Sequence, residues 1–147
     1  MLSWLFSEPL PVGQDAPEFT LRDQDGVSVS LAGLCGKNVV LVFYPADETT
    51  VCTKQLCEFR DNWALVESKD AMVLGINPGN EAKHARFRAN HGFPFGLLAD
   101  PGQRVGALYH AKGLIVKRTV YLVGKSGKIR YARRGKPVLE EVLAASE

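Results

Sequence analysis

The chain has 147 residues, enough to bury a hydrophobic core without disulfides or structural metals. Its charged fraction of 23% and apolar fraction of 46% are ordinary for a globular protein and argue against disorder. The formal net charge of +2 is too small to indicate nucleic acid, and no apolar run approaches the ~20 residues of a membrane-spanning helix. We therefore expect one domain, residues 1–147, that binds neither nucleic acid nor membrane.

The first half of the chain alternates strand and helix patterns. Residues 12–31 predict two short strands joined at Asp25-Gly26, a dipeptide that favours a hairpin turn. Residues 38–44 (NVVLVFY) form a continuous apolar run, which is typical of a central strand covered on both faces. After the loop PADETT, the pattern predicts a helix from about Val51 to Glu67.

The second half continues the alternation and ends in a hairpin and a helix. We expect a buried strand over 71–76, a helix over 81–92, an extended segment over 95–100, a short helix over 101–109, strands over 118–123 and 128–133, and a helix over 136–146. This order predicts an α/β fold of the thioredoxin-like kind, with a mixed central sheet, helices on both faces and an N-terminal β-hairpin.

Cys52 lies in the first turn of the expected helix, where an α/β sheet commonly forms its site. Advancing ~100° per residue places Leu56, Phe59, Trp63 and Val66 on the same apolar stripe as Cys52. Cys57 lies roughly 140° away by the same geometry, on a wetter flank. A buried cysteine is often a small hydrophobe, but free N–H groups in a first helical turn stabilise a thiolate, so we interpret Cys52 as reactive.

The cysteine content indicates a reducing compartment. Three cysteines are too few for a secreted disulfide scaffold of this length, and we expect a cytoplasmic protein. The opening MLSWLF is apolar but lacks the basic start and cleavage site of a signal peptide. Cys35 lies in a loop, LAGLCGKN, without activating neighbours, and we expect no catalytic role for it.

The stretch FYPADETTVCTKQLCEFRD, residues 43–61, resembles the active-site segment of peroxiredoxins, whose pattern is Pro-x-x-x-Thr-x-x-Cys. Pro45, Thr49 and Cys52 match this pattern in register. Cys57, followed by EFRD, is similar to the peroxiredoxin Q (bacterioferritin comigratory protein) branch. Similar flanking segments, from VGQDAPEFTL to RTVYLVGKSGKI, extend the resemblance over almost the whole chain.

The resemblance implies a thiol peroxidase acting on hydrogen peroxide and organic hydroperoxides in antioxidant defence. Cys52 would attack the peroxide, Thr49 would orient it, and Pro45 would shield the thiolate from water. Arg118, aligned with the arginine of the family's RSTFLI strand, would stabilise the thiolate, and Cys57 would resolve the oxidised Cys52 as an intramolecular disulfide. Thioredoxin or a similar dithiol protein would regenerate the enzyme, which we expect to be a monomer without metal, flavin or haem.

Helix geometry constrains that disulfide. Five residues along an α-helix separate the Cα atoms of Cys52 and Cys57 by ~8.7 Å, whereas a disulfide needs them within about 7 Å. We therefore expect the first turns of the helix to unwind before the bond forms.

The sequence also departs from the branch pattern. Thr50-Val51 stands where Pro-Gly is frequent, Asn77 replaces a usual serine, and YHAKGLIVK before Arg118 lacks a frequent tryptophan. Val51 narrows the pocket while its backbone N–H remains, so these differences bear on which peroxide is preferred.

Three other interpretations predict different properties. A zinc site could use His84, His91 or His110, but none has ligand spacing to the cysteines. A thioredoxin-like disulfide oxidoreductase would carry C-x-x-C and reduce insulin without consuming peroxide. A redox-inert interaction module would use the basic hairpin KSGKIRYARRGKP.

Overall fold

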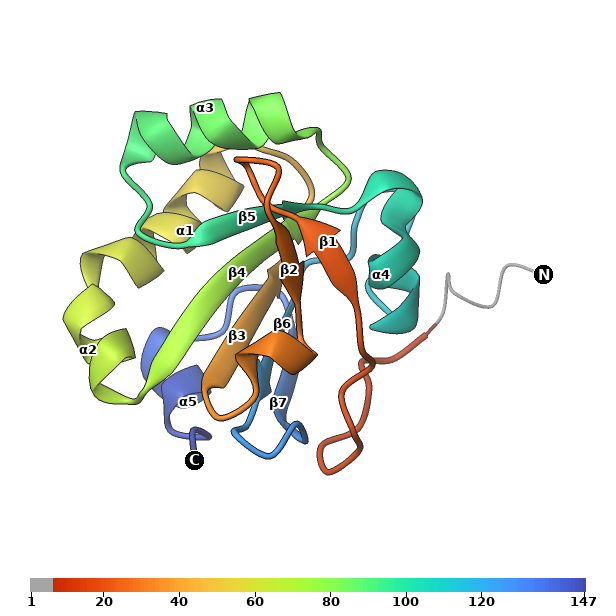
Figure 1. Cartoon of the computed structure of the whole chain (residues 1–147), viewed down its shortest axis with the longest axis vertical. Helices are drawn as coiled ribbons and strands as arrows, with labels where there is room; N and C mark the ends of the chain where they lie inside the picture. Colours follow the sequence, from red (N-terminus) through yellow and green to blue (C-terminus); the bar gives the residue numbers. More distant parts are fainter. Residues whose placement is uncertain (1–6) are drawn as a thin grey trace.

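The computed structural model describes residues 7–147, and the MLSWLF start lies outside them. One mixed sheet runs through the described residues in the order β2-β1-β5-β4-β3-β6-β7 (Figure 1). Its strands are β1 (Thr20–Arg22), β2 (Ser28–Ser30), β3 (Asn38–Phe43), β4 (Ala71–Asn77), β5 (Gly96–Ala99), β6 (Thr119–Val123) and β7 (Ile129–Arg134). β3, β4 and β5 are parallel, β6 pairs antiparallel with β3, and β7 pairs antiparallel with β6. The predicted mixed sheet and N-terminal hairpin are confirmed.

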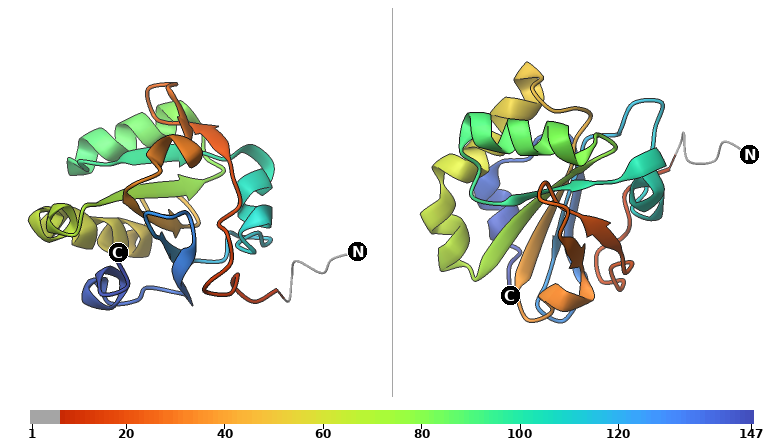
Figure 2. Two further views of the ribbon diagram at one scale, coloured as in Figure 1. Left: turned by 60° about the horizontal axis from the view of Figure 1, so that its bottom comes forward. Right: turned by 45° about the horizontal axis from the view of Figure 1, so that its top comes forward.

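Helices cover the two faces of this sheet (Figure 2). They are α1 (Thr50–Asp61), α2 (Trp63–Ser68), α3 (Glu81–His91), α4 (Arg104–Leu108) and α5 (Leu139–Leu143), with short 3-10 turns η2 (Ala32–Leu34) and η3 (Pro101–Gln103). Buried residues of α1, α2, α3 and α5 form one core, and those of α4 and the N-terminal segment form another. The predicted thioredoxin-like arrangement is confirmed.

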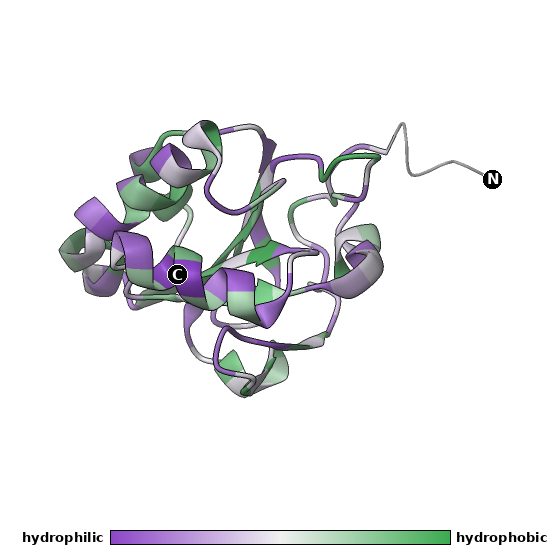
Figure 3. Cartoon of the chain, turned by 90° about the horizontal axis from the view of Figure 1, so that it is seen from above, coloured by the Kyte–Doolittle hydropathy of each residue, from purple (hydrophilic) through white to green (hydrophobic). Residues whose placement is uncertain are grey.

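The strands contribute to both cores because successive side chains point to opposite faces. On β3, Val40 and Val42 belong to the core that includes α1, here called the core under α1. Val39, Leu41 and Phe43 belong to the second core, which includes α4. Figure 3 shows mostly hydrophobic colours on the central strands and mixed colours on the helices around them. The continuous apolar run is thus explained by a central strand that is buried on both sides.

The helix expected over 51–67 is divided in two. Asn62 has φ −117° and ψ 31°, which ends α1, and α2 begins at the next residue. The Asn62 side-chain amide donates to the carbonyl of Glu58, so it competes with the backbone for a helical acceptor. The prediction of one continuous helix was wrong for this reason.

Two other predicted helices are shorter than expected. In the segment 101–109, Gly102 and Gln103 have positive φ, so a 3-10 turn precedes the five-residue α4. In the segment 136–146, Val138 stays extended, and the carboxylate of Glu58 accepts the N–H of Leu139 at 3.0 Å. This acceptor satisfies an N–H at the start of α5, which explains why the helix begins there.

Candidate active site

The connection from β3 to α1 places Cys52 in the first turn of a helix. Thr49 is the residue before α1, and its carbonyl accepts the first helical bond, from the N–H of Thr53 at 2.9 Å. The N–H groups of Thr50, Val51 and Cys52 precede that bond and have no helical acceptor. They therefore present partial positive charge beside the Cys52 sulfur.

Arg118 lies against Cys52. It directly precedes β6, and the pairing of Phe43 with Thr119 brings this end of β6 to the end of β3. The Nη2 group of Arg118 donates to the sulfur of Cys52 at 3.2 Å, and the cysteine is only 1% exposed. A guanidinium is always charged, so this contact stabilises a thiolate in a poorly solvated position. The structure thus brings together Cys52 and the arginine predicted from the late strand.

Gln55 belongs to the same group, although the sequence did not suggest it. Its side-chain oxygen accepts from Nη1 of Arg118 at 2.7 Å, and its nitrogen donates to the carbonyl of Gly135 at 3.3 Å. Gln55 is 4% exposed, one helical turn after Cys52 on the same face of α1. It fixes the guanidinium so that the other nitrogen reaches the sulfur.

Cys57 lies in the middle of α1 with its thiol free. It is partly buried and packs against the core that contains Cys52 and Phe59. The helix is intact over Thr50–Asp61, which by its geometry separates the two Cα atoms too far for a disulfide. Cys35, also free, is exposed in another loop, where its thiol contacts the carbonyl of Lys125 at 3.7 Å.

Thr49 and Pro45 flank α1 without a hydrogen bond to the sulfur. The Thr49 hydroxyl donates to the carbonyl of Ala46 at 3.3 Å and closes the loop on itself. Pro45 is half-buried and lines a cavity of about 310 Å³ together with Glu48 and Arg86. Their roles toward a peroxide stay predictions.

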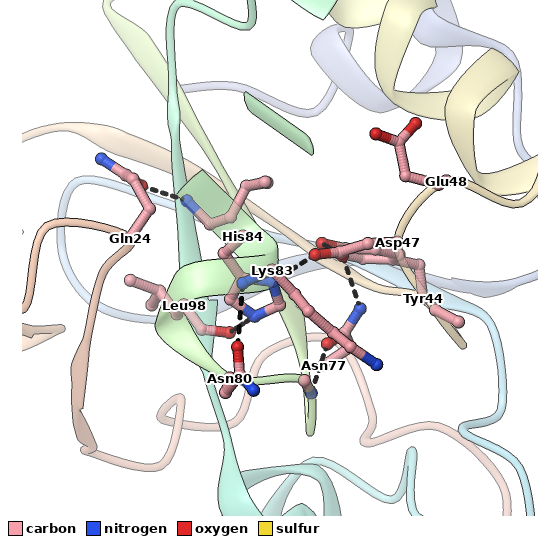
Figure 4. A network of polar contacts seen from close by, with 12 residues as sticks. Gln24, Tyr44, Asp47, Glu48, Asn77, Asn80, Lys83, His84 and Leu98 are labelled. Atoms are coloured by element: carbon pink, nitrogen blue, oxygen red, sulfur yellow. Dashed lines mark hydrogen bonds and ion pairs between the residues drawn. The ribbon is translucent and has the colours of Figure 1, made fainter. Parts of the chain in front are cut away.

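A buried polar network fixes the loop before α1 (Figure 4). The two carboxylate oxygens of Asp47 accept from the Tyr44 hydroxyl at 2.6 Å, from the Asn77 amide at 3.0 Å and from Nδ1 of His84 at 2.6 Å. Nε2 of His84 in turn meets the carbonyl of Leu98 at 3.2 Å. Both ring nitrogens of His84 therefore face oxygen acceptors.

The network shifts the pKa of its acidic groups in opposite directions. Burial raises the pKa of Asp47, but hydrogen bonds from His84 and Tyr44 outweigh it, so the net pKa lies below its ordinary value. Burial, followed by the charge of Asp47, raises the pKa of Tyr44 well above 10. Gly75 provides the space for this tyrosine, since a Cβ there would lie 3.0 Å from the Tyr44 ring. The loop therefore carries a carboxylate and a neutral phenol.

The three histidines weighed as zinc ligands have other partners. His84 is enclosed in the Asp47 network, His91 donates to Glu48 at 2.8 Å, and His110 faces the carbonyl of Glu8 at 2.8 Å. Within residues 7–147, no group of three or more His, Cys, Asp or Glu side chains is arranged to bind a metal ion.

The described residues also enclose a cavity away from the Cys52 site. A cavity of about 630 Å³ lies between the β1–β2 hairpin and the start of α3, and none of the five predicted site residues lines it. Among the helices of the described part of the chain, none is long and apolar enough to cross a bilayer.

Comparison with known proteins gives consistent matches. The AhpC/TSA family pattern matches residues 12–132. Peroxiredoxin Q, a chloroplastic protein of Oryza sativa subsp. japonica, is 43% identical over 123 residues, which cover 81% of this chain and 57% of the rice protein. The chain thus spans little more than half the length of this curated relative.

Solved structures agree with the sequence matches. The peroxidoxin BcpB of Mycobacterium tuberculosis superimposes with a TM-score of 0.87 at 30% identity, covering 92% of this chain and 96% of that one. A cysteine-to-serine mutant of PrxQ from Xylella fastidiosa has the same fold, with a TM-score of 0.85 at 24% identity over 94% of this chain and 96% of that one. The chain therefore belongs to the AhpC/TSA family, and its predicted resemblance to the peroxiredoxin Q branch is confirmed.

Proposed function

We propose that the protein is a peroxiredoxin that reduces hydrogen peroxide and organic hydroperoxides at Cys52. The Cys52 thiolate attacks one peroxide oxygen, the O–O bond breaks, and the other oxygen leaves as an alkoxide or hydroxide that takes a proton from water. The sulfur gains one oxygen and becomes a sulfenic acid. Arg118 and the first N–H groups of α1 lie where negative charge develops, so they stabilise this transition state.

The single observation that carries the proposal is the contact between Arg118 and Cys52. A buried sulfur in a first helical turn, 3.2 Å from a fixed guanidinium, is the environment that yields a reactive thiolate. A thioredoxin-like disulfide oxidoreductase requires a second thiol close to the first, whereas Cys57 is five positions further along the helix.

The cycle closes through Cys57. Its thiol attacks the sulfur of the Cys52 sulfenic acid, a disulfide forms, and the oxygen leaves as water. A dithiol protein such as thioredoxin then reduces the disulfide and is itself oxidised. Because the intact α1 keeps the two residues apart, its first turns open before this bond forms.

We place this activity in a monomeric, cytoplasmic protein. The small number of cysteines, three, supports a reducing compartment. The rice relative is named as chloroplastic, and its extra length leaves room for segments that this chain does not match. Fractionation and sedimentation measurements test the compartment and the oligomeric state.

Stopped-flow consumption of hydrogen peroxide by reduced protein tests the function. Cys52→Ser should abolish turnover, whereas Cys35→Ser, the matched control, should leave it unchanged. Cys57→Ser should react once and then accumulate sulfenic acid or over-oxidised protein. Mass spectrometry after one equivalent of peroxide should show a Cys52–Cys57 linkage within one chain. Peroxidase turnover in Cys52→Ser would overturn the proposal.

A further inference from the structure

The proposed cycle requires residues 49–57, here called the opening segment, to leave the helix. This inference rests on that proposed function and concerns what limits the opening. The opening segment contains both Cys52 and Cys57, and the contacts just outside its two ends differ from the contacts within it.

The residues before the opening segment are bonded to α3. Glu48 has φ +64°, a conformation that is uncommon outside glycine. Its carboxylate accepts from the Asn90 amide at 2.6 Å and from Nε2 of His91 at 2.8 Å. The preceding Asp47 is bonded to His84, also on α3, at 2.6 Å. Two consecutive loop carboxylates are thus attached to one helix.

The residues after the opening segment are also anchored. Nη1 of Arg60 donates to the backbone carbonyl of His91 at 2.6 Å. The Glu58 carboxylate accepts the N–H of Leu139 at the start of α5 at 3.0 Å. His91 therefore contacts both sides of the opening segment, Glu48 through its ring and Arg60 through its carbonyl.

His91 itself is in a fixed position. Its ring stacks on Phe93 with centroids 5.6 Å apart and meets the edge of Phe87 at 5.2 Å. Both phenylalanines are buried in the core under α1. Gly92, which ends α3 with φ +63°, donates its N–H to the carbonyl of Arg88. Rigid packing of this kind makes His91 a suitable fixed point for a neighbouring segment that moves.

The side chains of Cys52 and Gln55, within the opening segment, hydrogen-bond to residues beside β6 and β7 and not to α3. Arg118 contacts Cys52 at 3.2 Å and Gln55 at 2.7 Å, and Gln55 reaches the carbonyl of Gly135 at 3.3 Å. The contact between Arg118 and Cys52 is strongest when the sulfur is a negatively charged thiolate. Oxidation to a sulfenic acid removes this negative charge. Oxidation thus weakens the middle of the segment and leaves the α3 contacts at its ends unchanged.

We propose that His91 is a positioning residue that confines the opening of α1 to residues 49–57. With both ends attached to α3, the released chain stays short, and the oxidised Cys52 meets Cys57 before a second peroxide reaches it. Without the His91 contacts the opening spreads beyond Glu48 and Arg60, and it occurs more readily in the reduced protein as well.

Amide hydrogen exchange of the full chain, reduced and after one equivalent of hydrogen peroxide, tests this proposal. In the wild type, oxidation should accelerate exchange only across residues 49–57. In His91→Ala and Arg60→Met, the accelerated region should extend to 46–48 and to 58–61, respectively. Ala89→Ser, at an exposed position on the same helix, is the control and should exchange like the wild type.

A second measurement separates positioning from general destabilisation. Losing one hydrogen bond of this kind should shift the opening equilibrium about 2–10-fold. Amide exchange in the reduced His91→Ala protein should therefore be faster by about that factor across residues 46–57. His91→Gln keeps a side-chain N–H that can reach Glu48 and should restore both the slower exchange and the exchange boundary.

The outcomes distinguish this proposal from the function on which it rests. Absence of the Cys52–Cys57 linkage in the oxidised wild type overturns the resolving step of the proposed function and the role of His91 with it, whereas peroxide reduction at Cys52 is judged by Cys52→Ser. A linkage with wild-type exchange spread over all of α1 overturns the role of His91 alone. The same holds if His91→Ala and Arg60→Met behave like Ala89→Ser in amide exchange.

Discussion

At the scale of single residues, the site depends on one guanidinium placed by two neighbours. Arg118 donates to Cys52 at 3.2 Å and to Gln55 at 2.7 Å, so its plane is fixed by two acceptors on the same helix face. This fork geometry belongs to arginine, because a lysine ammonium is a point charge on a flexible stem. We therefore expect Arg118 to act through both its charge and its shape.

Arg118→Ala should lower the second-order rate with hydrogen peroxide by a factor of about 10²–10³, because a fixed charged donor is lost where negative charge develops. Arg118→Lys should recover only part of the rate. Stopped-flow measurement of the single reaction of reduced protein checks both values.

Arg133→Ala is the matched control for this prediction, since Arg133 is an exposed arginine on β7 that pairs with Glu141. It should react at the wild-type rate. Equal rates for Arg118→Ala and Arg133→Ala would remove Arg118 from the mechanism.

At the scale of elements, the loop between β3 and α1 is attached to α3 through the Asp47–His84 pair. The Asp47 side chain is 7% exposed and that of His84 is fully buried. A buried pair of this kind holds the loop in one position against α3. Removing one partner leaves the other buried without its partner, which strongly destabilises the folded protein. The loop is therefore expected to lose its position when the carboxylate loses its charge.

Acidification tests this attachment. Burial raises the pKa of Asp47, but bonds from His84 and Tyr44 lower it below the ordinary 3.8, so the charged form is favoured in the folded state. This stabilisation should be complete above pH 3.8 and should fade as the pH falls through the lower folded value. Urea unfolding between about pH 2.5 and 5 measures it as the slope of stability with pH.

Asp47→Asn should reduce that slope, whereas Asp25→Asn, at an exposed turn of the hairpin, should not. Other carboxylates contribute to the wild-type slope, among them Glu48, whose pKa is lowered by the bonds from Asn90 and His91. The comparison therefore depends on the difference between the variants. An unchanged slope in Asp47→Asn would contradict the assignment.

At the scale of the whole molecule, two cores share one sheet. β3 and β6 contribute alternate side chains to both, such as Val120 to one core and Tyr121 to the other. Neither core is complete without these strands. We therefore predict that the chain unfolds as one domain.

Urea or thermal unfolding followed by far-UV and near-UV circular dichroism should give coincident transitions. Coincidence is expected because loss of either core removes packing from the strands that support the other. Two separate midpoints would show that the cores are independent and would contradict the one-domain prediction. Cys52→Ser, which removes the reactive thiol, excludes oxidation as a cause of heterogeneity.

The local order of elements could be predicted because it depends on neighbouring residues. The apolar run 38–44 indicated a central strand, Asp25-Gly26 indicated the hairpin, and Pro45, Thr49 and Cys52 indicated the site. The same local reasoning failed at Asn62, where a side-chain bond to Glu58 ends a helix whose apolar stripe continues.

Local residue patterns were enough to predict the main strands and helices, the position of Cys52 at a helix start and the family. Arg118 was expected at the sulfur from the family resemblance, but only the fold shows that Gln55 holds it there and that His84 and His91 hold the loop before α1. These polar residues resemble surface positions in the sequence, because spacing along one element carries no information on what a neighbouring element presents. Their partners are set by the order in which β3, β4 and β6 pair, and only the folded sheet defines that order.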